Sequence, residues 1–441
     1  MRLWRYEISR LLAFVSEHIF RTHLSYVLMQ VRAQIITALG RVVKGAVCGA
    51  FGSIAALPPY TPGDLMRPLE SLDAAGMVAA TSNHVVKILV AAMIEEENKE
   101  VVAVACESFQ AVLELLGPCC LQPVMAPGWL VADGDAPQTL TATQALLQLL
   151  RESAPCQTKT SEVAEAGGGA EDGDDDDEDV DHDHELMDAV ADLVGGFAKA
   201  LGPQFAQISG DVLAVMAKYA KANRPASDRA MAIGCFAEVL EFMGPEAAAP
   251  LVPTVAPSVQ AGLSDASPSV RRNAAFATGV LAQTAPEQLA PHFPALLAAL
   301  HPLFQDTGVE QDYALRDNAL AAAARMMVAN LSAVPTAAVL PVYLDSLPLR
   351  ADFSENNTVY GCVAYLLEAR HPDVLALLPK ALIAASYGLQ AKDCSDAVKA
   401  KLVQALKGLA ADPAVGASLA SALPALAPEV ATVLQQALNH A

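Results

Sequence analysis

The sequence predicts an all-α chain built from repeated pairs of helices. Apolar residues make up 53% of the 441 residues and aromatic residues only 5%, with Ala and Leu dominant, which suits close packing of helices. Prolines recur at regular intervals. Pro203 and Pro245 are 42 residues apart, and Pro245 and Pro286 are 41 apart; Pro118 and Pro203 are 85 residues apart, about twice that interval. Each of these prolines closes an apolar run with helical spacing, and the sequence carries no strand signal.

A second marker repeats in the same register. The segment 265–276 recurs at 313–320, with Arg271 and Arg316 45 residues apart, and a weaker copy begins at Val31. In each copy a short Asp- or Pro-containing turn can start a helix, because Asp caps free N–H groups and Pro is tolerated in the first turn. A period of about 40–47 residues with two helices per unit is typical of HEAT and armadillo repeats, which stack into an α-solenoid, or superhelix. We interpret the polar residues of the marker as a structural ladder between repeats: Arg32, Asp265, Arg271, Asn273, Arg316 and Asn318.

The elements follow from this rhythm. Residues 1–84 are expected to form irregular helical repeats, residues 85–153 HEAT repeats, residues 154–184 a disordered acidic insertion, and residues 185–441 further HEAT repeats with a C-terminal cap. Single helices are expected at 101–116, 140–151, 186–201 and 424–441. The expected helix pairs are 204–222 with 228–243, 246–263 with 269–284, 288–305 with 313–330, 336–347 with 355–370, and 372–388 with 394–411.

The acidic insertion accounts for much of the long interval between Pro118 and Pro203. Residues 171–185 contain 11 carboxylates, about half of the net charge of −21. Self-repulsion and scarce apolar residues predict disorder. The segment is either a solubilising linker or an electrostatic arm that captures basic partners, and a metal site of Asp and His side chains is a third reading for which no spacing fixes the geometry. The residues expected to contribute to capture are Glu171, Asp172, Asp174, Asp175, Asp176, Asp177, Glu178, Asp179, Asp181, Asp183 and Glu185.

Composition and motifs argue against several other functions. The acidic charge disfavours nucleic acid, because phosphate binding needs a basic stripe. The eight cysteines include no C-x-x-C pair, so we expect neither a zinc site nor disulfides, and read them as buried apolar residues. Nucleotide-binding and hydrolase motifs are absent from the sequence, which predicts a protein without catalytic residues or cofactor. No signal peptide or membrane-spanning run is found, so we expect a soluble, intracellular monomer without a membrane partner.

Seven stretches, in this order, carry a resemblance to a known family: Ala154–Gln157, Glu185–Ala189, Asp265–Leu281, His292–Leu297, Leu315–Asn318, Leu347–Asp352 and Ala369–Val374. Together with the acidic insertion they make the chain resemble the C-terminal part of importin-beta-type nuclear transport receptors (karyopherins), nearest the importin-four branch, over roughly residues 85–425. The resemblance implies a receptor that shuttles between cytoplasm and nucleus with basic cargo such as ribosomal proteins or histones. It also implies weak contacts with Phe-Gly nucleoporins, and cargo release by Ran with GTP.

The chain also departs from that family. It has less than half the usual length and lacks the N-terminal repeats that bind Ran, so we expect a fragment, a truncated gene model or a degenerate copy. The competing interpretation is a HEAT-repeat scaffold, for example a regulatory subunit of a phosphatase. Such a scaffold would contact its partners through inter-repeat turns and leave the acidic segment unused.

Overall fold

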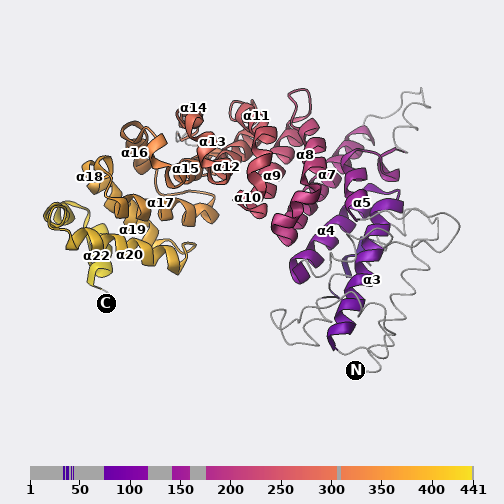
Figure 1. The fold of residues 1–441 in the computed structure, drawn as a ribbon, viewed down its shortest axis with the longest axis horizontal. Helices are drawn as coiled ribbons and strands as arrows, with labels where there is room; N and C mark the ends of the chain where they lie inside the picture. Colours follow the sequence, from indigo (N-terminus) through magenta and orange to yellow (C-terminus); the bar gives the residue numbers. More distant parts are fainter. Residues whose placement is uncertain are drawn as a thin grey trace. The chain divides into compact units, whose positions relative to one another are not determined.

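The computed structural model describes residues 33–34, 36–38, 41, 43, 74–117, 142–158, 175–304 and 309–439. Every element in these ranges is an α-helix or a short 3-10 helix, so the all-α prediction is confirmed (Figure 1). The chain divides into two compact units, Met1–Tyr219 and Ala220–Ala441. Most of the expected irregular region 1–84, including Arg32 of the predicted ladder, lies outside the described residues.

The first unit is organised around two helices that pack along each other. Its helices are α3 (Ala74–Glu95), α4 (Lys99–Leu116), α5 (Ala142–Leu150), α7 (Asp175–Leu201), η5 (Gly202–Phe205) and α8 (Ala206–Tyr219). Helix α4 packs against α7, where the fully buried rings of Phe109 and Phe197 meet edge to face with centroids 5.4 Å apart. The buried hydroxyl of Tyr219 donates to the carbonyl of Leu150 at 2.7 Å and thereby joins α8 to α5.

Helix α7 begins at Asp175, earlier than the sequence predicted. Residues 175–184 were expected to belong to the disordered insertion, but they continue the helix that was expected from residue 186. Carboxylates at the start of a helix interact favourably with its free N–H groups and its dipole, which favours this extension. Residues 155–158 form a further helical turn, and residues 159–174, which include Glu171, Asp172 and Asp174, lie outside the described part of the chain.

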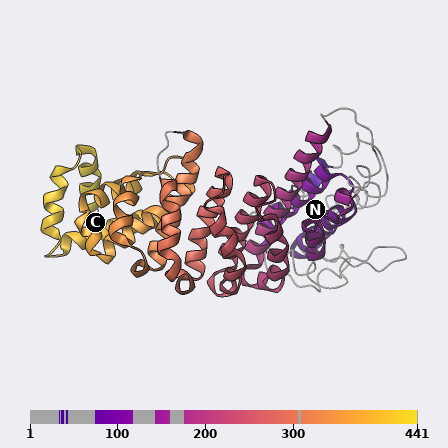
Figure 2. The same ribbon diagram turned by 90° about the horizontal axis from the view of Figure 1, so that it is seen from above.

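The second unit is a succession of helix pairs, in chain order (Figures 1 and 2). The first helices of the pairs include α11 (Val252–Gly262), α14 (Phe293–Leu300), α16 (Thr336–Asp345) and α19 (Leu378–Gln390). The second helices are α9 (Ala226–Met243), α12 (Pro268–Thr284), α15 (Tyr313–Ala329), α17 (Asn356–Ala369) and α20 (Asp396–Ala411). The second helices pack one against the next, from α9 to α20. Short helices α21 (Gly416–Ala422) and α22 (Pro428–Asn439) follow α20 at the C-terminal end.

The regularly spaced prolines lie where the first helix of a pair begins. Pro203, Pro245 and Pro286 stand at the beginning of η5, α10 (Pro245–Ala248) and α13 (Pro286–Leu289). Pro suits this position because its missing N–H would have had no partner there. Gly202 and Gly244, directly before two of these prolines, have φ of 53° and 78°, a conformation that favours glycine. The Gly-Pro pairs therefore end one helix and open the next, while Pro118 lies outside the described residues.

Packing between the second helices is unusually close at α15. All of residues 315–327 are buried, because α15 lies between α12 and α17, and residues 321–324 are four consecutive Ala residues. At Gly279 of α12 a Cβ atom would lie 3.0 Å from the Cα of Ala322 and 2.8 Å from the Cδ of Arg325. Glycine and alanine thus allow α12 and α15 to approach closely. Among the described helices, none combines the length and apolar character that a bilayer-spanning segment requires.

Candidate functional site

The acidic part of α7 is the first candidate site. Of its predicted carboxylates, the structure describes the side chains of Asp183 and Glu185, and both are exposed. One oxygen of Asp183 lies 2.9 Å from the ammonium nitrogen of Lys99 on α4. The same end of the helix, residues 175–181, carries six more of the predicted carboxylates: Asp175, Asp176, Asp177, Glu178, Asp179 and Asp181. The end of α7 is therefore rich in negative charge.

A second concentration of charge lies in the second unit, on its second helices and on the short helix η11 (Phe353–Glu355) that leads into α17. Arg325 of α15 donates to Glu355, with Nη2 and Oε1 2.9 Å apart, although the two residues are only 6% and 4% exposed. The guanidinium carbon of Arg325 lies 5.0 Å from the centroid of the Phe276 ring on α12, a cation–π distance. The missing side chain of Gly279 leaves the space through which Arg325 passes.

Glu241 of α9 completes what we call the Arg325 cluster: Glu241, Phe276, Arg325 and Glu355. The Glu241 side chain reaches solvent, yet the surrounding protein removes enough water to raise its pKa; Arg325 opposes this rise and Glu355 adds to it. Glu355 therefore pairs directly with the Arg325 guanidinium, and Glu241 is close enough to experience the charges of both groups. Oε2 of Glu355 and Nη1 of Arg325 are buried without a hydrogen-bond partner among the described residues. A carboxylate oxygen in this state can accept a hydrogen bond from a bound cation or other donor.

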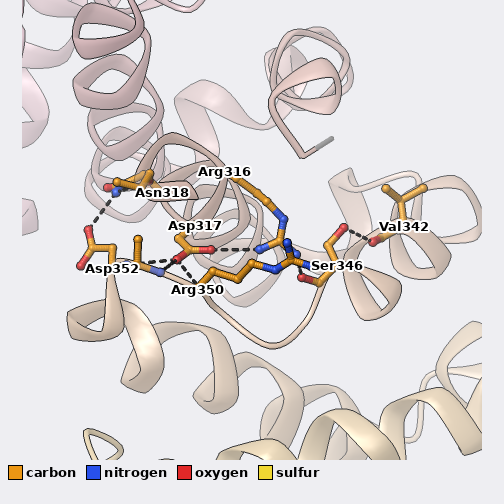
Figure 3. A network of polar contacts seen from close by, with 9 residues as sticks. Arg316, Asp317, Asn318, Val342, Ser346, Arg350 and Asp352 are labelled. Carbon is orange, nitrogen blue, oxygen red and sulfur yellow. Dashed lines mark hydrogen bonds and ion pairs between the residues drawn. The ribbon is translucent and has the colours of Figure 1, made fainter. Parts of the chain in front are cut away.

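The predicted ladder residues near α15 make contacts between repeats (Figure 3). Arg316 donates to the carbonyl of Ser346, and Asn318 donates to the carboxylate of Asp352 at 2.8 Å. Between them in sequence, Asp317 is completely buried. One of its oxygens accepts the backbone N–H groups of residues 350–352 at 2.8, 2.7 and 3.0 Å, and the other lies 3.1 Å from Nη1 of Arg316. Three consecutive residues of α15 thus hold the turn that precedes α17.

The ladder residues near α12 divide into two kinds. Asp265 receives two hydrogen bonds of 2.8 Å from Arg229 of α9, and Asn273 donates to the carbonyl of Ala230 at 2.8 Å. Both contacts join neighbouring repeats. Arg271 instead donates to the carbonyls of Asp265 and Ala266 in its own turn, both at 2.8 Å, because it lies one turn after them. The Arg229 guanidinium, followed by the Ser267 N–H, holds the pKa of Asp265 below its usual value, against the opposing effect of burial.

Sequence reasoning missed several residues of these sites: Arg229, Asp317, Arg325 and Glu355. A signal for Arg325 was present, because a single charge inside the apolar run 319–328 must find a partner when the helix is buried. Asp317 stands between two residues that had been selected, but nothing local showed that its carboxylate faces the next turn.

The described residues contain no group of His, Cys, Asp or Glu side chains that could hold a metal ion. Five cysteines are described, and all are buried with free thiols: Cys106, Cys156, Cys235, Cys362 and Cys394.

Comparison with known proteins relates the chain to nuclear transport receptors. No family model matches it. It is 32% identical over 187 residues to the probable importin subunit beta-4 of Schizosaccharomyces pombe, a match that covers 42% of this chain and 17% of the relative. It is 29% identical over 226 residues to importin-4 of Homo sapiens, covering 51% of this chain and 20% of the relative. The matches thus span about a fifth of the length of these relatives.

Solved structures show the same fold. The crystal structure of Kap121p bound to RanGTP has a TM-score of 0.56 and 15% identity, and the match covers 83% of this chain and 31% of Kap121p. Kap121p bound to Nup53p has a TM-score of 0.56 and 16% identity, with 93% and 36% covered. The predicted α-solenoid class is confirmed by this likeness, and the predicted resemblance to importin-beta-type receptors near importin-4 is confirmed by the sequence relatives.

Proposed function

We propose that the chain is a cargo-binding part of a nuclear import receptor and that it binds Lys- and Arg-rich segments, with ribosomal proteins and histones as the expected cargo. The importin relatives support a role in nuclear import, which makes or breaks no covalent bond and needs no cofactor. Kap121p has been crystallised with RanGTP and with Nup53p, which supports Ran and nucleoporins as further partner classes, and we propose Phe-Gly nucleoporins within the second class. Such a receptor shuttles between cytoplasm and nucleus.

The observation that carries the proposal is the carboxylate-rich N-terminal end of α7. Asp183 and Glu185 face solvent there, in a chain whose net charge is −21. A surface of one sign attracts partners of the opposite sign and raises their rate of encounter, and this attraction weakens as salt screens it.

The Arg325 cluster supports the same proposal from the second unit. Glu241 and Glu355 together exceed the charge of Arg325 by one, and Oε2 of Glu355 is without a partner among the described residues. A lysine ammonium that binds beside the exposed Glu241 would balance this excess negative charge. We therefore expect the Arg325 cluster to be a second place in the chain where basic segments bind.

The test is binding of histone-tail or ribosomal-protein peptides to the whole chain, measured by calorimetry over a series of salt concentrations. Deletion of residues 171–185 should weaken binding strongly, and binding to the unaltered chain should fall steeply with salt. The pair Asp183→Asn and Glu185→Gln should weaken binding measurably. The matched pair Glu287→Gln and Glu429→Gln removes the same charge from two exposed sites elsewhere and should have a smaller effect.

Binding that ignores salt, or no binding to either cargo, would contradict the proposal. A stable complex with a phosphatase catalytic subunit, without binding of basic tails, would instead favour the scaffold interpretation.

A further inference from the structure

We propose that Lys99 is a built-in competitor for the basic ligands of α7: in the free chain its ammonium occupies Asp183, and a basic segment must displace it. The inference rests on the proposed function, because it concerns the same acidic end of α7. Its consequence is selectivity. A single cation competes poorly with a counter-ion that is already in place, whereas a cluster of lysines or arginines can displace it.

The position of Lys99 is the first reason. Lys99 is the first residue of α4, where a positive charge opposes the helix dipole and a carboxylate would be favoured. Its side chain is also 8% exposed, so its ammonium has lost most of its water. A buried ammonium needs an opposite charge nearby, and Asp183 provides one at 2.9 Å.

The turn before α4 fixes Lys99 in this place. Glu96 is buried, and its Oε1 accepts the N–H groups of Glu97 and Asn98 at 2.9 and 3.1 Å. The side chain of Asn98 then caps α4 by accepting the N–H of Val101 at 3.1 Å. The ammonium is therefore presented to α7 by an ordered turn.

Asp183 is accessible to a competitor, which is the second reason. Its side chain is 57% exposed, and Leu186, three residues later, is fully buried against the unit. Asp183 thus stands where the acidic end of α7 meets the packed part of the helix, with Lys99 on one side and solvent on another. The ion pair between Arg229 and Asp265 differs, because those side chains are only 15% and 14% exposed.

The experiment compares Lys99→Met with the unaltered whole chain in calorimetric titration with an oligolysine peptide. Methionine keeps the buried stem of the side chain and removes the ammonium. Lys99 is buried but Asp183 is 57% exposed, so solvent and salt partly screen the pair, and we take its contribution as up to about 1 kcal/mol. Loss of the competitor should therefore tighten binding about two- to fivefold at low salt, and the gain should shrink as salt rises. Lys199→Met is the matched control: it removes one positive charge from the other end of α7, where Lys199 pairs with Glu114 at 3.8 Å.

A second measurement needs no substitution. Mass spectrometry would follow acylation of lysine amines with and without an oligoarginine peptide, which carries no side-chain amine. Displacement predicts faster labelling of Lys99 when the peptide is bound, with little change at Lys199.

The outcomes separate the two proposals. If the unaltered chain binds oligolysine but Lys99→Met binds no more tightly, or Lys199→Met gains as much, the competitor is overturned and the proposed function stands. If Lys99→Met does not fold, unchanged or slower labelling of Lys99 with bound oligoarginine overturns it. If neither the unaltered chain nor a variant binds either peptide at any salt concentration, the proposed function is contradicted, and so is the proposal that Lys99 competes with basic ligands.

Discussion

At the scale of single residues, Asp317 has the densest set of polar contacts in the second unit that we describe. Its buried carboxylate accepts three backbone N–H groups of residues 350–352 and faces Arg316. Asp317→Ala would leave those three donors and the Arg316 guanidinium without this acceptor. Since removing one partner of a buried, hydrogen-bonded charge pair costs about 3–5 kcal/mol, we expect a loss of that size in the free energy of unfolding, measured by urea denaturation.

A surface pair in the same unit provides the control. Asp345 lies 2.6 Å from the ammonium of Lys380, but the two side chains are 58% and 41% exposed. Asp345→Ala should therefore change stability by no more than about 1 kcal/mol. Equal effects of the two substitutions would show that the Asp317 contacts do not hold the turn.

The residue scale is also where sequence reasoning reached least far. Arg316 and Asn318 were selected because they recur at the repeat period, but Asp317 shares no such recurrence with its counterpart at position 272, which is Arg272. The partners of the Arg325 cluster are separated in sequence by up to 114 residues, from Glu241 to Glu355. Such contacts arise only when the helices stack, so no local pattern encodes them.

At the scale of elements, close approach of α12 and α15 depends on Gly279. A Cβ there would lie 3.0 Å from the Cα of Ala322, which is backbone and cannot turn aside. Gly279→Ala should therefore push the helices apart and lower stability, by about 1–3 kcal/mol as for other overpacked sites. Thermal and urea unfolding of the purified chain would measure this change.

Gly361 of α17 is the matched position. It is also a helical glycine of the second unit, but a Cβ there would meet no atom within 4 Å. Gly361→Ala should be neutral or stabilising, by up to about 1 kcal/mol, because alanine favours the helix. If both alanines stabilise the protein, the approach of α12 to α15 does not depend on the missing side chain of Gly279.

Elements are also the level at which the sequence was most informative. The expected helix pairs of the second unit agree with the observed helices to within a few residues, because Gly-Pro pairs and Asp- or Pro-containing turns mark their ends directly. The start of α7 was wrong by ten residues or more, since a run of carboxylates predicts disorder while the helix that follows it favours its continuation. Local composition cannot weigh these two tendencies against each other.

At the scale of the whole molecule, helices contact mainly their neighbours in the stack. The second helices pack in order from α9 to α20, so each repeat draws its stability from the repeats on either side. The negative charge has a separate distribution, because 11 of the 49 carboxylates fall within residues 171–185. These carboxylates proposed for binding can therefore be changed without altering the stacked helices of the second unit.

Because each repeat is stabilised by its neighbours, we expect the buried cysteines in different parts of the chain to become accessible separately during unfolding. Cys106 and Cys156 belong to the first unit and Cys235, Cys362 and Cys394 to the second. Burial raises the pKa of the Cys156 thiol to about 11 and that of Cys362 to about 12, so both are protonated and protected at neutral pH. In a stack whose parts open separately, rising urea should expose these thiols in more than one step.

Pulsed thiol labelling followed by mass spectrometry would resolve those steps. Gly279→Ala should lower the urea concentration at which Cys362 on α17 becomes reactive and leave Cys106 on α4 unchanged, because only the former lies in the destabilised unit. Simultaneous labelling of all five cysteines, shifted together by Gly279→Ala, would mean that the chain unfolds as one cooperative body. Labelling in separate steps would instead show that the repeats carrying the Arg325 cluster can unfold while α7 remains packed against α4.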